Sequence, residues 1–481
     1  MFLKRIVFFS LLFITHLTWG DLEQEVQKIV NSASLNKGTA GVCIIDTATN
    51  QPIININSSK SMIPASNQKL LTTGAALHVL GPEFSYETKL YKEGKNLIIV
   101  GDGDPTLGDT ELNGTPKWSK ERLLLEQELE PWIQAVLDSG MTEVDTLVVD
   151  DRIFDRNFIH PTWPSDQINN WYCAQVSGIN YHLNVFHFFP SPNKGGRANL
   201  SNYTPSMPWL SISNKTSSNT SANDKSSFWV ARSPNSNTIT ARGNVKATHT
   251  EPVKVAFHDG AIVFGNTLAT ELRKKNITVN RIVRIDESHS KQTGYPIYTR
   301  TTPIQHALIR SNRDSHNLYA ESILKRISAS VTGRPGTFDE GSQVVETSIR
   351  QRLGKIEGNL SVTDGSGMSR DNALSPTLIA RWLASFDIDE PAGEALINSL
   401  ATPGQGTLRK RFLGHTFTSG SVHAKSGYLR GVSSLSGYIL FNSGRAPLVF
   451  SIIVNNINGT VKGAKKMQES IVFAAFNEFN N

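Results

Sequence analysis

Cysteine is scarce in this sequence, with two residues in a chain of 481. So few cysteines exclude a disulfide scaffold and a cysteine-rich zinc site. Charged residues make up 19% of the chain, below the usual share of about a quarter. The formal net charge is +6, and no block of five or more like charges occurs. The absence of such blocks excludes a basic arm or stripe, and the low density of net charge argues against nucleic acid as a partner.

Long apolar runs are missing after the first twenty residues, so we expect no later segment to cross a membrane. At the start, Lys4 and its basic neighbour precede an apolar run at 6–14, and a small residue, Gly20, follows. This order is typical of a secretory signal peptide. We therefore predict that residues 1–20 are removed on export, with an uncleaved anchor or a buried helix as the alternative.

The two ends of the chain carry matching patterns, and apolar residues (38%) are numerous enough to form cores. Strand-like hairpins lie near both ends, and each has a neighbouring segment with helical spacing of apolar residues. The segments are 21–33 (helix), 40–45 and 52–56 (strands), 435–441 and 448–454 (strands) and 461–479 (helix). We predict a multi-domain α/β protein in which both ends build one antiparallel sheet covered by helices.

The middle of the chain differs, because short apolar runs alternate with turns from about 84 to 286. Residues 211–227 are rich in Ser, Thr and Asn, which predicts a polar loop or a solvated strand edge. We expect 84–286 to be an insertion of one or two mostly β domains, with two nested domains favoured, between the two parts of the end-built domain, 21–83 and 287–481. 

The two cysteines lie far apart in the sequence. Cys43 is in an apolar strand-like run, and Cys173 is in the segment WYCAQVSG. Two separately buried thiols are expected, and a disulfide between them in an oxidising compartment is the alternative.

Three short motifs carry the candidate chemistry, and each alone also fits a purely structural role. Ser66 and Lys69 are three residues apart at the start of a helix-like run, which places a hydroxyl and an amine on one face. A neutral amine can activate a serine nucleophile. The other two motifs are Ser315-His316-Asn317, at the start of a second helical run, and Lys425-Ser426-Gly427, at a strand.

The order of these motifs is that of the penicillin-recognising serine acyl-transferases. The wider sequence resembles the D-alanyl-D-alanine carboxypeptidase/endopeptidase family of the DacB type, the class C low-molecular-mass penicillin-binding proteins or S13 peptidases. The resemblance rests on seven segments: PASNQKLLTTGAAL (64–77), GDGDPTL (101–107), VVDDRIFD (148–155), VSGINYHLN (176–184), SHNLYAE (315–321), DGSGMSRDNALSP (364–376) and AKSGYLRGVSSLSGY (424–438). It implies a transpeptidase-like domain, a periplasmic location and peptidoglycan peptides as substrates, with β-lactams as covalent inhibitors.

The resemblance also implies a role for each motif residue. Ser66 would attack a D-Ala-D-Ala peptide bond, Lys69 would take its proton, and Ser315 would relay a proton to the departing D-Ala. Lys425 would keep Lys69 neutral and, with Ser426, bind the terminal carboxylate. Further residues that would contribute are Asn317, which orients the substrate amide, and the strand residues Gly427 and Tyr428, the latter through a backbone N–H of the oxyanion site.

Two arginines complete the expected site. Arg370 and Arg430 are predicted to bind stem-peptide carboxylates, because a guanidinium can hold a carboxylate with two hydrogen bonds; ordinary salt bridges are the alternative. No cofactor and no metal site are expected, since His316 and His423 lack further converging ligands. Two other functions stay open at this point, a β-lactamase-like hydrolase and a non-catalytic cell-wall binding protein. A loose association with the membrane or cell wall is also left open.

Overall fold

The computed structural model describes residues 19–112, 118–219, 221, 225–286, 292, 294–356 and 359–480. Residues 1–18, which make up most of the expected signal peptide, lie outside the described residues. Within the described part, no helix combines the length and apolar character that crossing a membrane requires.

Both ends of the chain build one five-stranded antiparallel sheet, as predicted. Its strand order is β16-β17-β18-β1-β2, so the first strand of the chain pairs with the last. The register runs from Thr39 opposite Asn455 to Asp46 opposite Leu448. The strands are β1 (Thr39–Asp46), β2 (Gln51–Ile56), β16 (Gly420–Leu429), β17 (Val432–Phe441) and β18 (Leu448–Asn455).

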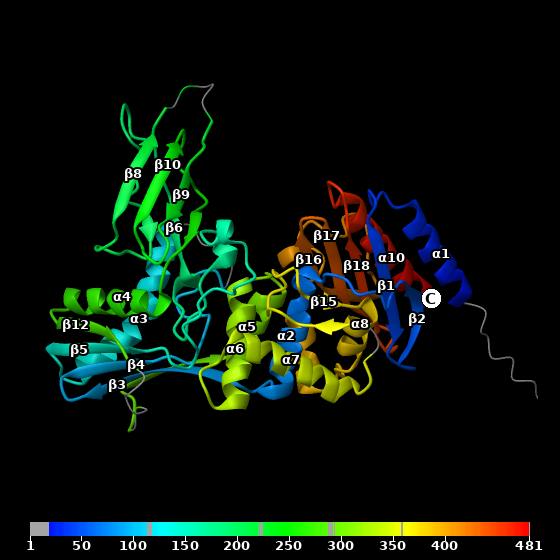
Figure 1. Ribbon diagram of the computed structural model, residues 1–481, viewed down its shortest axis with the longest axis horizontal. Coiled ribbons are helices and arrows are strands. Elements are labelled where there is room, and N and C mark those ends of the chain that lie inside the picture. The colour runs from blue at the N-terminus through cyan, green and yellow to red at the C-terminus, as the bar shows by residue number, and fades with distance from the viewer. Residues whose placement is uncertain are drawn as a thin grey trace, which may run out of the picture.

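Helices cover both faces of this sheet (Figure 1). On one face, α1 (Trp19–Ser32) and α10 (Lys462–Phe479) pack together over a core that includes Val26 and Ile471. On the other face, helices from the middle of the sequence surround a second core that includes Trp382. These helices are α2 (Gln68–Val79), α5 (Ile304–Asn312), α6 (Asn317–Thr332), α7 (Phe338–Leu353), α8 (Pro376–Ala384) and α9 (Pro391–Asn398). Every residue of β18 is buried, because the sheet is covered on both sides.

A second five-stranded sheet, of order β12-β5-β4-β3-β13, is built mainly from the inserted segment. Its strands are β3 (Ser85–Glu93), β4 (Asn96–Val100), β5 (Glu143–Asp150), β12 (Thr278–Arg284) and β13 (Tyr298–Pro303). Strands β4, β5 and β12 are parallel, and α3 (Trp118–Asp138) and α4 (Gly260–Lys274) lie between them in sequence. Parallel neighbours need such crossovers. The short apolar runs of this segment had predicted strands, and they did not predict these two helices.

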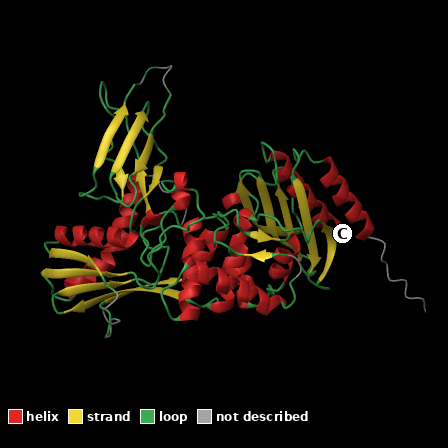
Figure 2. Cartoon of the chain, viewed as in Figure 1, coloured by secondary structure: helices red, strands yellow, loops and turns green. Residues whose placement is uncertain are grey.

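Two three-stranded sheets complete the insertion, and one of them projects away from the rest of the molecule (Figures 1 and 2). The projecting sheet has the order β8-β10-β9, and the other has the order β11-β6-β7. The strands are β6 (Val185–Phe188), β7 (Tyr203–Thr204), β8 (Ile212–Ser217), β9 (Trp229–Arg232), β10 (Ile239–Asn244) and β11 (Val253–Ala256). The polar segment 211–227 thus contributes β8, a strand at a sheet edge, which was one of the two expected forms.

The remaining elements are short. A two-stranded ladder joins β14 (Leu360–Ser361) to β15 (Ala373–Leu374). Short 3₁₀ segments are η1 (Ala65–Asn67), η2 (Ser165–Gln167), η3 (Trp171–Cys173), η4 (His182–Asn184) and η5 (Gly406–Leu408). The division of the chain into domains stays a prediction. Because β13 pairs with β3, however, the inserted sheet extends to Pro303, beyond the limit expected at residue 286.

The two cysteines do not form a disulfide. Cys43 in β1 and Cys173 in η3 are both free and fully buried. Burial raises the pKa of the Cys43 thiol to about 11 and that of Cys173 to about 12. Both thiols are therefore protonated at neutral pH and shielded from solvent. Because the thiolate is the reactive form, we expect both to be unreactive in the folded protein.

We predict that neither thiol reacts with a thiol-specific reagent such as Ellman's reagent while the protein is folded. After unfolding in guanidinium chloride without reductant, both thiols should react, giving a count of two per chain. A rapidly reacting thiol in the folded protein would contradict the burial, and a count of zero after unfolding would indicate a disulfide.

Candidate active site

Ser66 lies in a tight turn at the mouth of α2. The preceding residue, Ala65, has a φ of 48°, in the left-handed region that non-glycine residues seldom adopt. Gly367 lies directly against this turn, where a Cβ atom would be 1.9 Å from the Ala65 carbonyl oxygen. The Ser434 hydroxyl lies 2.6 Å from the carbonyl oxygen of Pro64. The turn is thus held from two sides, which fixes the direction of the Ser66 side chain.

Lys69 follows one helical turn after Ser66 and is fully buried. Its Nζ donates hydrogen bonds to Ser66 Oγ (3.2 Å), to Asn317 Oδ1 (2.8 Å) and to the Ser366 carbonyl oxygen (2.7 Å). Burial lowers the pKa of Lys69 to about 8. About a tenth of the Lys69 amine is therefore neutral at pH 7, within reach of the Ser66 hydroxyl.

A second buried lysine, Lys425 in β16, faces the same region. Its Nζ donates to Ser315 Oγ (2.8 Å) and to the Ser426 carbonyl oxygen (2.6 Å). Burial and then the positive charge of Lys69 hold the pKa of Lys425 well below its ordinary value. Ser315 itself has a φ of 62°. The structure therefore contains two amine–hydroxyl pairs, Lys69 with Ser66 and Lys425 with Ser315.

Asn317 is the first residue of α6 and links the site to the inserted segment. Its Oδ1 accepts from Lys69, and its Nδ2 donates to the Tyr172 carbonyl oxygen (2.9 Å). Each half of the amide is therefore used by a different neighbour. This arrangement fixes the side chain beside Ser66, where a substrate amide could meet it.

Strand β16 passes very close to Ser66 at Gly427. A Cβ atom at Gly427 would lie 2.9 Å from the backbone nitrogen of Ser66 and 2.2 Å from Ser434 Oγ. Glycine is needed here because any side chain would force the strand away from the helix. The next side chain, Tyr428, points outward and is 60% exposed.

A cavity of about 590 Å³ opens beside Ser66. Both predicted arginines line it, and the Arg370 guanidinium donates from Nη2 to the Arg430 carbonyl oxygen (2.5 Å). Aromatic, thioether, amide and guanidinium side chains are all among its lining groups. Other lining residues include Gln167, Trp171, Tyr172, Asn317, Gly367, Met368 and Tyr428.

Glu321, for which the sequence predicted no role, lies beneath the site. This buried carboxylate in α6 accepts hydrogen bonds from the backbone nitrogens of Gly365 (3.0 Å) and Ser366 (2.8 Å). Burial, then the charge of Asp364, raises the pKa of Glu321 to about 8. Glu321 thereby holds the loop whose Ser366 carbonyl receives Lys69. The segment SHNLYAE contained this residue, but a single acid in a helical run does not reveal a buried backbone contact.

Asp364 stabilises the same loop from its other side. It is fully buried, and its oxygens accept from the backbone nitrogens of Gly367 (2.8 Å) and Ser369 (2.7 Å) and from Trp163 Nε1 (3.0 Å). The conformation of the loop is therefore set by two carboxylates rather than by a regular element. This explains why the segment 364–372 carries such a distinctive sequence.

All residues predicted for the site lie in one region around Ser66. Hydrogen bonds join the five catalytic candidates in two groups, one around Lys69 and one around Lys425, while Tyr428, Arg370 and Arg430 line the cavity. The side chain of Ser426 is half-buried on β16 between Lys425 and Gly427.

Known proteins resemble this chain in sequence and in fold. The model of the D-Ala-D-Ala carboxypeptidase 3 (S13) family matches residues 22–476. A D-alanyl-D-alanine carboxypeptidase of Actinomadura sp. (strain R39) is 27% identical, over 91% of this chain and 82% of the relative. D-alanyl-D-alanine carboxypeptidase DacB of Haemophilus influenzae is 23% identical, over 97% and 94%. The crystal structure of penicillin binding protein 4 (dacB) from Haemophilus influenzae has a TM-score of 0.75 at 22% identity, covering 95% of this chain and 99% of that one. With its motifs gathered around Ser66 and a family match across almost its whole length, the chain belongs to the D-Ala-D-Ala carboxypeptidase 3 (S13) family.

Proposed function

We propose that this protein is a serine-type D-alanyl-D-alanine carboxypeptidase or endopeptidase that acts on peptidoglycan stem peptides. Family membership supports the reaction class. The observation that carries the mechanism is the hydrogen bond between Lys69 Nζ and Ser66 Oγ, made by a lysine whose pKa is lowered to about 8. A buried amine of this kind can act as a general base, as the chemistry of a serine nucleophile requires.

Acylation begins when neutral Lys69 takes the proton from Ser66. The Ser66 oxygen attacks the carbonyl carbon of the D-Ala-D-Ala peptide bond and forms a tetrahedral intermediate. In this proposal the backbone N–H groups of Ser66 and Tyr428 stabilise its oxyanion, which is supported by the close approach of β16 to Ser66 at Gly427. The C–N bond then breaks, and the acyl group remains on Ser66.

The departing amine needs a proton, which the second lysine pair supplies. Lys425 holds the Ser315 hydroxyl by a 2.8 Å hydrogen bond, so Ser315 can pass a proton to the leaving D-Ala while Lys425 replaces it. Asn317 orients the substrate amide, and Ser426 with Lys425 binds the terminal carboxylate. Water then attacks the acyl carbon and gives a proton through Ser315 to neutral Lys425. The bond from this carbon to Ser66 Oγ breaks, Lys69 returns its proton to Ser66 Oγ, and the shortened peptide leaves.

β-Lactams act as inhibitors in this proposal, because their opened ring stays bound to Ser66 instead of leaving. A crystal structure of penicillin binding protein 4 (dacB) from Haemophilus influenzae is a complex with a β-lactam. The proposal also includes export to the periplasm, supported by the signal-like pattern of residues 1–20. Peptidoglycan peptides would be met in that compartment.

The central prediction is a long-lived penicilloyl adduct on Ser66. Incubation with labelled penicillin followed by peptide mapping in a mass spectrometer should locate one adduct per chain, and Ser66→Ala should carry none. Rapid turnover of the penicillin would instead show a β-lactamase. The absence of both adduct and turnover in the wild-type protein would contradict an active serine enzyme and leave a binding protein.

The rate of acylation should rise with pH up to about 8 and then level off. Lys69 must lose its proton to act as the base, so below its pKa of about 8 the rate should fall by about tenfold per pH unit. Stopped-flow measurement of acylation by a chromogenic β-lactam between pH 6 and 9.5 tests this. Lys69→Arg is the control, because arginine stays protonated and cannot act as a base. Its acylation rate should be lower than that of the wild type by about a thousandfold or more. A flat wild-type profile would exclude Lys69 as the base.

Arg370 and Arg430 are proposed to bind carboxylates of the stem peptide from the rim of the cavity. Replacing either by alanine should lower kcat/KM for a carboxylate-bearing peptide by about 10- to 100-fold, the loss of one charge-assisted interaction. The same variants should act normally on the amidated peptide. Arg122→Ala in α3 is the matched control, since that exposed arginine pairs with Glu126. Equal kinetics of wild type and variants on both peptides would contradict the proposal.

A further inference from the structure

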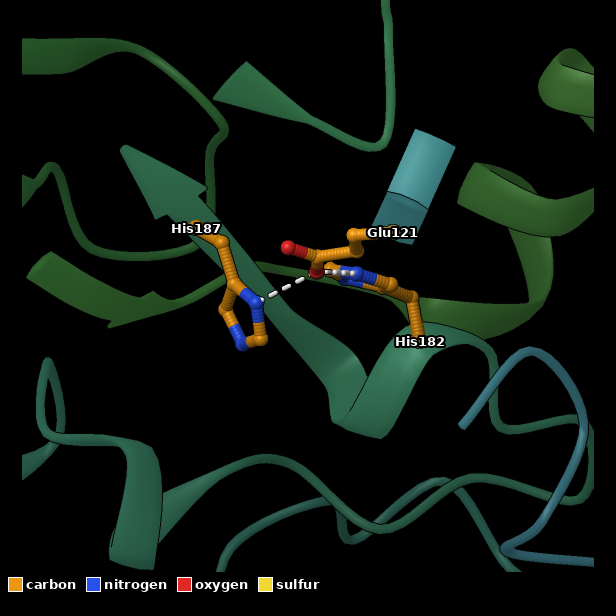
Figure 3. A group of neighbouring side chains, drawn as sticks. All are labelled: Glu121, His182 and His187. Atoms are coloured by element: carbon orange, nitrogen blue, oxygen red, sulfur yellow. Dashed lines mark hydrogen bonds and ion pairs between the residues drawn. The ribbon is translucent and has the colours of Figure 1, made fainter. Parts of the chain in front are cut away.

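Three side chains with metal-ligating atoms meet in the core of the inserted segment, in addition to the site around Ser66. They are Glu121 from α3, His182 from η4 and His187 from β6, and all three are buried (Figure 3). One ligand atom from each lies within 4.8 Å of the other two. Glu121 Oε1 is 2.8 Å from His182 Nε2 and 2.6 Å from His187 Nδ1.

The oxygen at the centre of this cluster has more neighbours than its lone pairs can serve. Besides the two imidazole nitrogens, Thr204 Oγ1 (3.0 Å) and Thr110 Oγ1 (3.4 Å) are directed at Glu121 Oε1. A carboxylate has about four lone-pair sites on two oxygens, so about two are available on each. A cation that bonds the carboxylate and both imidazoles would remove two of the four competing donors from this oxygen.

The backbone around His182 supports a functional position. His182, Leu183 and Asn184 have φ values of 50°, 59° and 54°, three consecutive non-glycine residues in the left-handed region. Such a conformation is strained and persists only where the surroundings hold it. Here Asn184 holds it, because its Oδ1 accepts from the Tyr181 backbone nitrogen (2.9 Å). The result is that His182 points at Glu121.

His182 is also oriented in the manner of a metal ligand. Its Nδ1 lies 2.8 Å from the Val185 carbonyl oxygen and therefore carries a proton. Metal-binding histidines usually donate their second ring N–H to a carbonyl or a carboxylate, which fixes the ring and leaves the other nitrogen for the metal. The free position of His182 is Nε2, the atom that faces Glu121.

We propose that Glu121, His182 and His187 bind one divalent transition-metal ion. Their nitrogen and oxygen donors suit zinc. Two imidazoles and one carboxylate form a common zinc ligand set, with bonds of about 2.0–2.2 Å. Binding requires the ligand atoms to move apart slightly from their present hydrogen-bonded separations. The ion replaces the proton between His182 Nε2 and Glu121, and that proton passes to solvent. The ring proton of His187 moves from Nδ1 to Nε2, which frees Nδ1 for the ion. The buried ion would tie α3 to β6 and stabilise the inserted segment.

Metal analysis of the full chain tests the proposal without relying on activity. After treatment with a chelator and buffer exchange, titration with zinc should give about one bound ion per chain by inductively coupled plasma mass spectrometry. Zinc at about a hundred times its Kd should raise Tm by about 3 °C. His187→Gln keeps a hydrogen-bond donor near Glu121 but removes the imidazole, so it should bind no zinc and show no zinc-dependent shift.

His249→Gln is the matched control, because His249 belongs to the same insertion and its ring contacts Phe228 instead. It should bind zinc as the wild type does. The proposal is overturned if the wild-type protein binds no zinc, or if His187→Gln binds as much as the wild type. Penicillin acylation of the same samples should not depend on zinc, which separates this proposal from the function proposed for Ser66.

Discussion

The burial of two lysine side chains in one small space is the constraint on which the site depends. An ammonium group removed from water is costly unless it is hydrogen-bonded, so each lysine needs fixed acceptors. Lys69 has three and Lys425 has two, and these acceptors come from several separate parts of the chain. Desolvation lowers the pKa of both amines, and the charge of Lys69 lowers the pKa of Lys425 further. The reactivity of Ser66 is therefore a consequence of packing.

The fold meets this constraint by bringing both ends of the chain into one sheet. Strand β16 carries Lys425 and lies at the edge of the sheet whose central strand is β18, which pairs with β1. The turn that holds Ser66 is fixed against β17 through Ser434. The site thus spans segments that are hundreds of residues apart, and it forms only when the sheet is complete. The insertion contributes through Tyr172, whose carbonyl fixes Asn317.

Much of this arrangement could be predicted from the sequence, because the motifs combine distinctive residue types with local patterns. The sheet formed from both ends followed from two hairpins and two amphipathic helices. Helices α3 and α4 were not predicted, because the short apolar runs between 84 and 286 favoured strands. Glu321 and the Glu121 cluster were missed for a different reason. Glu121 is 61 and 66 residues from its histidine partners, and no local pattern reports contacts over such distances.

The loop of Ser366 shows why a carboxylate is needed beneath the site. Both oxygens of Glu321 accept backbone N–H groups, so glutamine would place its NH₂ group against one of these donors. Only an acceptor on both sides holds the Ser366 carbonyl against Lys69. Burial raises the pKa of Glu321 to about 8, so most of this group is uncharged at neutral pH. Desolvation lowers the pKa of Lys69 to about 8 against the opposing charges of Asp364 and then Glu321. Burial of the whole group therefore allows a glutamate to shape the site without disabling its base.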